Sequence, residues 1–292
     1  MSLPKIDDHW NYNDPDSTAA AFRKLLAQHP EAPSAWRLEL RTQLARTHSL
    51  TQRFDAAHAV LDDVEESLTA SHGDSTRVRV RVLLERGRTY RSAGELDQAR
   101  PLFEQALELA REGGEEGLTV DSAHMLALVE DGDRALAWNR EALAMAESSE
   151  QEAARRWLGA LYNNTGWALH DLGRLDEALE VFNRALSFRE TQGQDKPILI
   201  ARWCVGRCLR SLGRLEEALA LQNALRDSYA SIGEPSGYNA EELGELHLAL
   251  GDGEQARVWF GQAWEILSKD TWLVKHEPER LARLASLGGR QG

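Results

Sequence analysis

The segment HDLGRLDEALEVF, residues 170–182, decides the architecture, because nearly the same segment occurs elsewhere in the chain. It returns as RSLGRLEEALALQ at residues 210–222, and an earlier copy reads RSAGELDQARPLF at residues 91–103. In each copy an alanine follows a glycine by five positions, and the residue four positions after the alanine is usually aromatic or large and apolar. Such a recurrence predicts an array of similar units rather than a single globular core.

The alanine of this pattern can be followed through six copies that are 36 to 43 residues apart. The six anchors are Ala57, Ala99, Ala135, Ala178, Ala218 and Ala256. Apolar residues fall at helical spacing on both sides of the glycine, so each unit is predicted to be two helices joined by a tight turn. Gln52 takes the place of the glycine in the first copy. The third copy is shorter in its turn by two residues, which leaves its register unassigned.

One stretch conflicts locally with this pattern. The alternating sequence RVRVRV at residues 77–82 is typical of a strand. Because the segment LLERGRTY continues directly after it with helical spacing, we predict a helix there.

The pattern resembles the tetratricopeptide repeat, in which the first helix carries aromatic-x-x-L-G-x-x-Y and the second carries A-x-x-x-F. Residues 159–186 match best, through Tyr162, Gly166, Leu169, Gly173, Ala178, Phe182 and Ala185. The long repeats are similar to those of kinesin light chains and bacterial peptide-sensing regulators. The resemblance covers about residues 34–269 and implies an all-α, right-handed superhelix of about six repeats, an α-solenoid. HEAT-type arrays have a similar period but lack this glycine, alanine and aromatic pattern.

The ends of the chain are predicted to cap this array. We expect residues 1–33 to form an N-terminal segment and a capping helix, residues 34–269 to form the six repeats, and residues 270–292 to form a C-terminal capping helix and tail. Asp14 and Pro15 are a typical helix start. Two roles fit Trp10 and Tyr12: they anchor the N-terminal segment onto the first repeats, or they belong to a homodimer contact.

A groove follows from the geometry of the array. First-helix positions that point away from the packing face are expected to line the concave side, where such arrays bind ligands. Counting from each turn glycine, the candidate ligand-binding residues are Gln43, Arg46, Arg81, Arg88, Arg91, Asn163, Asn164, Trp167, His170, Trp203, Arg207 and Arg210. Glu85, Cys204, Glu241, Glu242 and Glu245 fall at the same kind of position.

The arginines of this set point to the chemistry of a ligand. Arginine holds a carboxylate through two parallel hydrogen bonds, so the groove is predicted to suit an acidic or carboxylate-bearing ligand. Asn164 matches the position where this repeat class holds a bound peptide's backbone, and tryptophan and arginine are common at binding hot spots. The alternative is a solvated surface in which, for example, Glu85 simply pairs with Arg88.

Composition narrows the possible partners. A net charge of -13 and a pI near 5.2 argue against nucleic acid and anionic membranes. Neither a signal peptide nor a membrane-spanning segment is recognisable, and the two cysteines, Cys204 and Cys208, are expected to be reduced packing residues. A cytoplasmic location is therefore predicted.

Recognisable catalytic motifs are missing from the sequence. The histidines are dispersed, and no P-loop, dinucleotide-binding or nucleophile-elbow motif occurs, so neither an enzyme nor a cofactor is predicted. We expect a scaffold or adaptor that binds a protein or peptide. The alternative is a regulator that changes conformation when a small peptide binds, and an enzyme is the third possibility.

Overall fold

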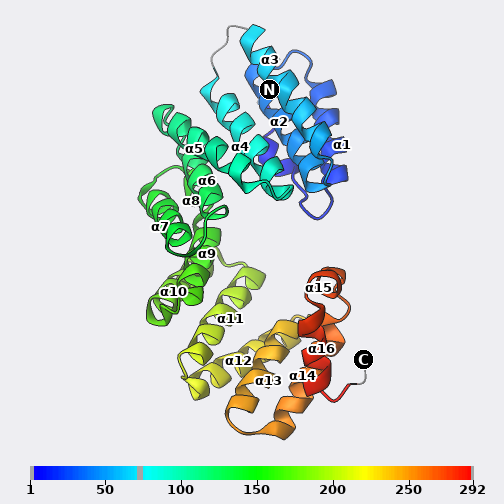
Figure 1. Ribbon diagram of the computed structural model, residues 1–292, viewed down its shortest axis with the longest axis vertical. Coiled ribbons are helices and arrows are strands. Elements are labelled where there is room, and N and C mark those ends of the chain that lie inside the picture. Colours follow the sequence, from blue (N-terminus) through cyan, green and yellow to red (C-terminus); the bar gives the residue numbers. More distant parts are fainter. Residues whose placement is uncertain (1–2, 71–74, 291–292) are drawn as a thin grey trace. The chain divides into compact units, whose positions relative to one another are not determined.

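The computed structural model describes residues 3–70 and 75–290, which form helices joined by short connections (Figure 1). Within those two ranges no residue lies in a β-strand. The chain divides into a first unit, residues 1–161, and a second unit, residues 162–292. The all-α prediction is therefore confirmed.

The first unit begins with a short 3-10 helix and continues through eight α-helices. They are η1 (Ile6–His9), α1 (Pro15–Gln28), α2 (Ser34–Leu50), α3 (Phe54–Ala70), α4 (Thr76–Ser92), α5 (Leu96–Glu112), α6 (Glu116–Ala127), α7 (Gly132–Ser148) and α8 (Glu152–Arg155). The boundary between the units falls within α9. The remaining helices are α9 (Leu158–Asp171), α10 (Leu175–Gln192), α11 (Asp195–Ser211), α12 (Leu215–Ser231), α13 (Gly237–Ala249), α14 (Gly253–Leu267), α15 (Thr271–His276) and α16 (Pro278–Leu287).

Six helix pairs correspond to the six sequence copies. They are α2–α3, α4–α5 and α6–α7 in the first unit and α11–α12 and α13–α14 in the second, together with α9–α10, whose Gly166 and Phe182 pack in the second unit. We call the first helix of each pair the A-helix and the second the B-helix. The RVRVRV stretch lies inside α4, as its continuing helical period predicts.

The turn between A-helix and B-helix needs a left-handed residue. Gly173 has φ +73°, and the N–H of Arg174 donates to the carbonyl of Leu169 at 2.9 Å, which closes the end of α9. Gln52 adopts the same conformation with φ +60° in the first pair. The turn geometry is thus kept where glycine is missing, at a conformational cost of about 1–2 kcal/mol.

A second recurring glycine lies inside the A-helix, seven residues before the turn glycine, and it has a direct packing cause within one pair. Phe103 of α5 is fully buried, and a Cβ placed on Gly87 of α4 would lie 2.5 Å from its ring. Gly244 and Phe260 repeat the arrangement, with a corresponding distance of 2.8 Å. A small residue in the A-helix therefore makes the space that the B-helix ring fills.

The fifth pair fills the same space with a polar side chain. Gln222 of α12 is fully buried below Gly206, and its Oε1 accepts a hydrogen bond from Nδ2 of Asn239 at 2.7 Å. The side-chain amide of Asn239 also donates to the backbone carbonyl of Gln222 at 3.0 Å. The amide pair satisfies groups that would be costly to bury alone.

The third pair differs from the sequence expectation. Its turn is not shortened: residues 128–131 connect α6 to α7, whereas only residues 93–95 connect α4 to α5. The A-helix is the shorter element, with 12 residues in α6 against 17 in α4. Gly132, with φ +57°, begins the B-helix instead of ending the A-helix turn, so it stands only three residues before Ala135.

The first and last helices cover the ends of their own units. Asp14 caps α1 by accepting from the N–H of Ser17 at 3.0 Å, and Pro15 is the first helical residue, as predicted. Phe22 of α1 packs with Leu40 and Leu44 of α2. In the second unit, Leu281 and Leu284 of α16 join the core formed by the last helix pair.

Candidate functional site

The predicted groove positions assemble into one surface on each unit. We define the first face as Gln43, Arg46, Arg81, Glu85, Arg88 and Asp121, which lie on α2, α4 and α6. We define the second face as Asn163, Asn164, Trp167, His170, Trp203, Arg207, Arg210, Tyr238, Glu241, Glu242 and Glu245, which lie on α9, α11 and α13. Each face is formed by A-helices alone.

The first face contains a buried network of charges. Arg88 donates to Glu85 at 2.7 Å and also pairs with Asp121 of the next A-helix. Gln43 reaches the same Glu85 oxygen from α2 at 3.2 Å. Gln43, Arg81 and Arg88 are buried, and their role in binding a ligand stays a prediction.

Electrostatics keep this network ionised. Burial alone would lower the pKa of Arg88, but the carboxylates of Asp121 and Glu85 raise it instead. Burial likewise opposes ionisation of Asp121, yet Arg88 and the more distant Arg81 hold the pKa of that carboxyl below its usual range. Arg88 is therefore a paired cation and not a free one.

Arg81 and Arg91 behave differently from each other. Arg81 is buried and donates to Glu39 of α2 at 3.3 Å. Arg91 is exposed, and its Nε donates to the backbone carbonyl of Leu128 at 3.4 Å. Burial and the nearby Arg88 lower the pKa of Arg91.

The N-terminal segment covers the first face. The indole N–H of Trp10 donates to Oε1 of Gln43 at 3.2 Å. The guanidinium of Arg46 lies 5.5 Å from the Trp10 ring and 5.4 Å from the Tyr12 ring, and the two rings stack at 4.8 Å. Of the two roles that the sequence left open for Trp10 and Tyr12, the structure shows the anchoring one.

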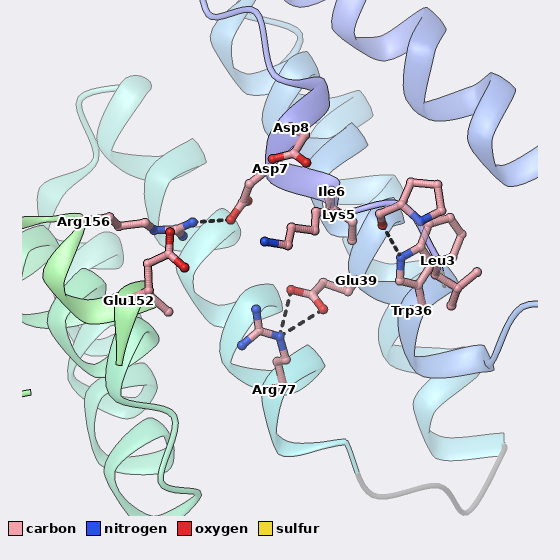
Figure 2. A pocket seen from close by; sticks show the side chains of 12 residues that line it. Leu3, Lys5, Ile6, Asp7, Asp8, Trp36, Glu39, Arg77, Glu152 and Arg156 are labelled. Carbon is pink, nitrogen blue, oxygen red and sulfur yellow. Dashed lines mark hydrogen bonds and ion pairs between the residues drawn. The ribbon is translucent and has the colours of Figure 1, made fainter. Parts of the chain in front are cut away.

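A pocket of about 390 Å³ lies beside this segment in the first unit (Figure 2). Its walls come from residues 3–8, α2, α4 and α8. Arg77 donates there to Glu39 of α2 at 3.0 Å and to Glu115, the residue before α6, at 2.7 Å. Across the pocket, Asp7 pairs with Arg156, as the dashed line in the figure marks.

The second face carries a row of aromatic rings. Trp167 of α9 lies 5.9 Å from Trp203 of α11, and Trp203 lies 6.3 Å from Tyr238 of α13, measured between ring centroids. The indole N–H of Trp203 donates to the backbone carbonyl of Tyr238 at 3.2 Å. Trp167 and Trp203 are half-buried, while Tyr238 is 39% exposed. The row therefore offers apolar surface to a ligand.

Polar groups flank the aromatic row. Asn163 and Asn164 are half-buried on α9, and Asn163 accepts a weak hydrogen bond from the thiol of Cys204 at 3.5 Å. His170 and Ser211 are 2.9 Å apart, and Arg207 donates to the same Ser211 hydroxyl at 2.6 Å. Backbone groups of an extended ligand could exchange hydrogen bonds with such side chains.

The arginines of the second face are paired with carboxylates of the next A-helix. Arg210 donates to both oxygens of Glu242, at 2.7 and 2.9 Å, and Arg207 lies 3.1 Å from the same carboxylate. Arg280 of α16 holds Glu241 in the same way, and Arg283 pairs with Glu245. Burial lowers the pKa of Arg207, an effect that Glu242 opposes and Arg210 reinforces.

Sequence reasoning missed Tyr238 and this pairing. The sequence pattern places Glu241 and Glu242 in the groove, but a pattern within one copy does not reveal their contacts with the neighbouring copy. The available signal was the acidic character of the sixth copy opposite the arginines of the fifth. Tyr238 stands thirteen residues before Gly251, the same offset as that of Arg81 from Gly94.

The cysteines are packing residues of the second unit. Both are unbridged and buried, and burial raises the pKa of Cys204 to about 12. The thiol of Cys208 contacts the carbonyl of Leu175 at 3.4 Å. Across residues 3–70 and 75–290, no group of three or more histidine, cysteine, aspartate or glutamate side chains is arranged to hold a metal ion. In the same ranges no helix has the length and apolar character to cross a bilayer.

Several solved structures share this fold. RapI in its apo form gives a TM-score of 0.74 at 14% identity and covers 97% of this chain and 78% of the RapI chain. NprR in complex with its cognate peptide NprX gives 0.53 at 16% identity, with 97% and 81% covered. BtubC from P. vanneervenii gives 0.61 at 18% identity, with 79% and 93% covered. Identities this low establish a common fold alone.

Sequence comparison identifies the family. No curated protein matches the chain. The profile of the tetratricopeptide repeat matches residues 36–112, 78–148 and 116–191, which together span more than half of the chain. The paired helices, left-handed turns and glycine–aromatic packing described above agree with that match. The chain therefore belongs to the tetratricopeptide repeat family.

Proposed function

We propose that this protein is a non-enzymatic scaffold that binds a peptide or a peptide segment of a partner protein on its second face. The observation that carries the proposal is the row Trp167, Trp203 and Tyr238, with spacings of 5.9 and 6.3 Å. Alternate side chains of an extended chain are about 6.6 Å apart, because each residue advances about 3.3 Å. Each ring is thus positioned to contact one of the alternate side chains that point to the same side of an extended peptide.

Asn163, Asn164 and His170 supply the polar part of the proposed site. They lie on the same A-helix as Trp167, close enough to meet the backbone of a peptide that runs along the rings. Side chains that can both donate and accept suit a ligand backbone. The ring surfaces contribute affinity, and the amides and imidazole set the orientation.

An acidic ligand remains part of the proposal, in a modified form. Arg207 and Arg210 already hold Glu242, so a ligand carboxylate would replace Glu242 in that pair. Exchange of one carboxylate for another gains little free energy in a half-buried site, because each ion must be desolvated. We therefore expect the aromatic row to dominate affinity and the arginines to tune selectivity.

The proposal can be tested by selecting binders from a display library of random 12-residue peptides on the full chain. A selected peptide should bind Trp203→Ala at least about 10-fold more weakly than wild type, since hot-spot tryptophans often contribute about 2 kcal/mol or more. Tyr238→Ala should show a smaller loss in the same direction. Trp272→Ala is the matched control, because Trp272 of α15 is 57% exposed and is not part of the second face.

Two outcomes decide the matter. Equal affinity for wild type, Trp203→Ala and Tyr238→Ala, with unchanged circular dichroism, would contradict the second face as the binding surface. Selected peptides prepared with a free carboxylate and with a C-terminal amide test the acidic preference separately. A difference between the two forms that disappears in Arg207→Ala would support it.

A peptide-sensing regulator is the second candidate function. It is favoured by the structural likeness to NprR, which was solved with its cognate peptide bound. In that case a short peptide should change the conformation of the chain, and small-angle scattering with and without a selected peptide would detect it. An unchanged scattering profile at saturating peptide would favour the scaffold.

A further inference from the structure

Residues 3–12 lie along the first unit as a bound peptide would, with Trp10 and Tyr12 on the first face and the earlier residues beside it. Pro4 accepts a hydrogen bond from the indole N–H of Trp36 at 3.3 Å, and Asp7 pairs with Arg156. Farther along, Trp10 and Tyr12 stack beneath the guanidinium of Arg46. Figure 2 shows Asp7 pointing away from its own segment, toward Arg156. Several side chains of the segment therefore make specific contacts with the rest of the first unit.

The segment occupies positions equivalent to the proposed site on the second unit. Gln43 and Arg46 stand nine and six residues before Gln52, and Asn164 and Trp167 stand at the same offsets from Gly173. Gln43 accepts a hydrogen bond from Trp10, and Arg46 covers the two aromatic rings. The first face thus uses its own ligand-binding positions to hold part of the same chain.

The N-terminal segment does not fill all of the space above the first face. A pocket of about 300 Å³ remains between the segment and the first face, lined on one side by Trp10 and Tyr12 and on the other by Arg46 and Arg81. Tyr12 is 58% exposed, and the ion pair of Asp7 with Arg156 is about half exposed on both sides. Exposed pairs contribute little free energy, so these anchors can open at small cost.

Helix α1 does not depend on the segment for its own packing. Phe22 and Leu25 of α1 are buried against Leu40 and Leu44 of α2, and Ile6 and Trp10 only add to the edge of that cluster. Trp10 meets Phe22 edge-on, with ring centroids 5.3 Å apart. Asn11 exchanges hydrogen bonds with the Thr18 hydroxyl of α1, but that hydroxyl also donates to the Asp14 carbonyl within the helix start. Release of residues 3–12 would therefore expose the first face without unfolding the helix that follows.

We infer that the first face is a second peptide-binding surface, occupied in cis by residues 3–12, and that its partner in trans is an acidic-aromatic peptide. The segment defines the required chemistry: a carboxylate to meet Arg156, then an indole three residues later and a second aromatic ring two residues after that, both beneath Arg46. A partner binds by displacing the segment. The inference concerns a different face from the one proposed above and stands independently of it.

The test uses the full chain and a fluorescein-labelled peptide with the sequence of residues 3–14, LPKIDDHWNYND, followed by fluorescence anisotropy. Asp7→Ala combined with Trp10→Ala weakens the cis segment while leaving the first face intact. We expect the labelled peptide to bind this double variant at least 10-fold more tightly than wild type, because a competitor bound nine-tenths of the time lowers apparent affinity tenfold. Adding Arg46→Ala should remove most of that gain.

Two controls locate the binding. A peptide with alanine in place of its Asp7, Trp10 and Tyr12 equivalents should not bind the double variant. Trp203→Ala, added to the double variant, should leave the affinity unchanged. If Trp203→Ala abolishes binding, the peptide occupies the second face and the inference is wrong, while the function proposed above is not.

Two further outcomes would overturn the inference. One is a double variant that keeps its helical circular dichroism but does not bind the peptide. The other is equal binding by wild type, the double variant and the Arg46→Ala variant. Should the double variant fail to fold, Asp7→Ala alone replaces it, with an expected gain of two- to threefold and the same dependence on Arg46. No gain with that single variant would equally refute the inference.

Discussion

The two faces use the same positions of the same repeat, yet they treat them in opposite ways. On the first face, Arg88 is buried between Glu85 and Asp121, and the N-terminal segment lies over its neighbours. On the second face, Trp203 and Tyr238 present partly exposed rings, and the arginines lie at their margin. The repeat therefore fixes where a side chain points, while the neighbouring segment decides whether a ligand can reach it.

The difference also separates stability from recognition. A buried ion network is costly to break, because removal of one partner leaves an uncompensated charge. A half-exposed ring can be removed at smaller cost to the fold while its contact surface is lost. Substitutions at equivalent positions should therefore act mainly on unfolding in the first unit and mainly on binding in the second.

The largest effect is expected from Arg88→Met. The variant leaves Glu85 and Asp121 buried without their shared cation, which should lower the free energy of unfolding by about 3–5 kcal/mol. Urea denaturation monitored by circular dichroism measures the change. A loss below about 1 kcal/mol would mean that Arg46 or water compensates the two carboxylates, and the contrast between the faces would weaken.

Acidification should lower the free energy of unfolding of the first unit through His124. Burial and the nearby Arg88 lower the pKa of His124 on α6 to about 4, from an ordinary value of 6.5, although Asp121 opposes the shift. The unfolded chain therefore takes up a proton below pH 6.5 that the folded chain refuses until near pH 4. Stability is fully present above pH 6.5 and falls as the pH drops, by up to about 3 kcal/mol.

The matched variant for this pH effect is His124→Gln, which cannot titrate. Its free energy of unfolding should depend less steeply on pH between 6.5 and 4 than that of wild type. Denaturation series at several pH values give both slopes. Parallel slopes would show that His124 does not set the pH dependence of the first unit.

A smaller contrast is expected at the glycines that make room for the B-helix. Gly87→Ala brings a Cβ to 2.5 Å from the rigid, fully buried ring of Phe103, and overpacking of this kind typically costs about 1–3 kcal/mol. Gly206→Ala brings its Cβ to 2.5 Å from Nε2 of Gln222, which makes a long hydrogen bond of 3.5 Å to the Trp203 carbonyl. This end of the side chain can rotate slightly while Oε1 keeps its hydrogen bond from Asn239. The cost of Gly206→Ala should be below about 1 kcal/mol, since alanine also favours the helix. Thermal melting of both variants tests the order, and a reversed order would contradict it.

The smallest effect on stability is expected from Arg207→Met. Arg210 keeps both of its hydrogen bonds to Glu242, so the carboxylate stays compensated. The free energy of unfolding should change by less than about 1 kcal/mol. A loss as large as that of Arg88→Met in the same urea assay would show that the two faces do not differ in this respect.

The helix pairs could be predicted from sequence because their causes are local. The glycine turn, the alanine and Phe103 or Phe182 lie within one copy, and the small residue that admits the ring lies in the preceding helix. Asp14 and Pro15, which are adjacent in sequence, likewise predict the start of α1. Short-range patterns of this kind survive in any copy that keeps its spacing.

The state of the groove arginines could not be predicted in the same way. Arg88 takes its second carboxylate from Asp121, which lies in the copy whose register the sequence left open. Arg210 takes Glu242 from a helix that begins more than twenty residues later. Trp10 covers part of the first face only because a segment that precedes the repeats folds back onto it. Contacts between copies are set by the array, so a pattern read within one copy cannot reveal them.

The buried amide pair of Gln222 and Asn239 bears on how such an array can evolve. It joins the B-helix of the fifth pair to the A-helix of the sixth, so Oε1 of Gln222 and the side-chain N–H groups of Asn239 find partners across the junction. If either pair were duplicated, deleted or recombined, a buried amide would lose its hydrogen-bond partner. This would lower the free energy of unfolding by about 1–3 kcal/mol. At this junction the order of the modules is itself encoded, and the copies are no longer interchangeable.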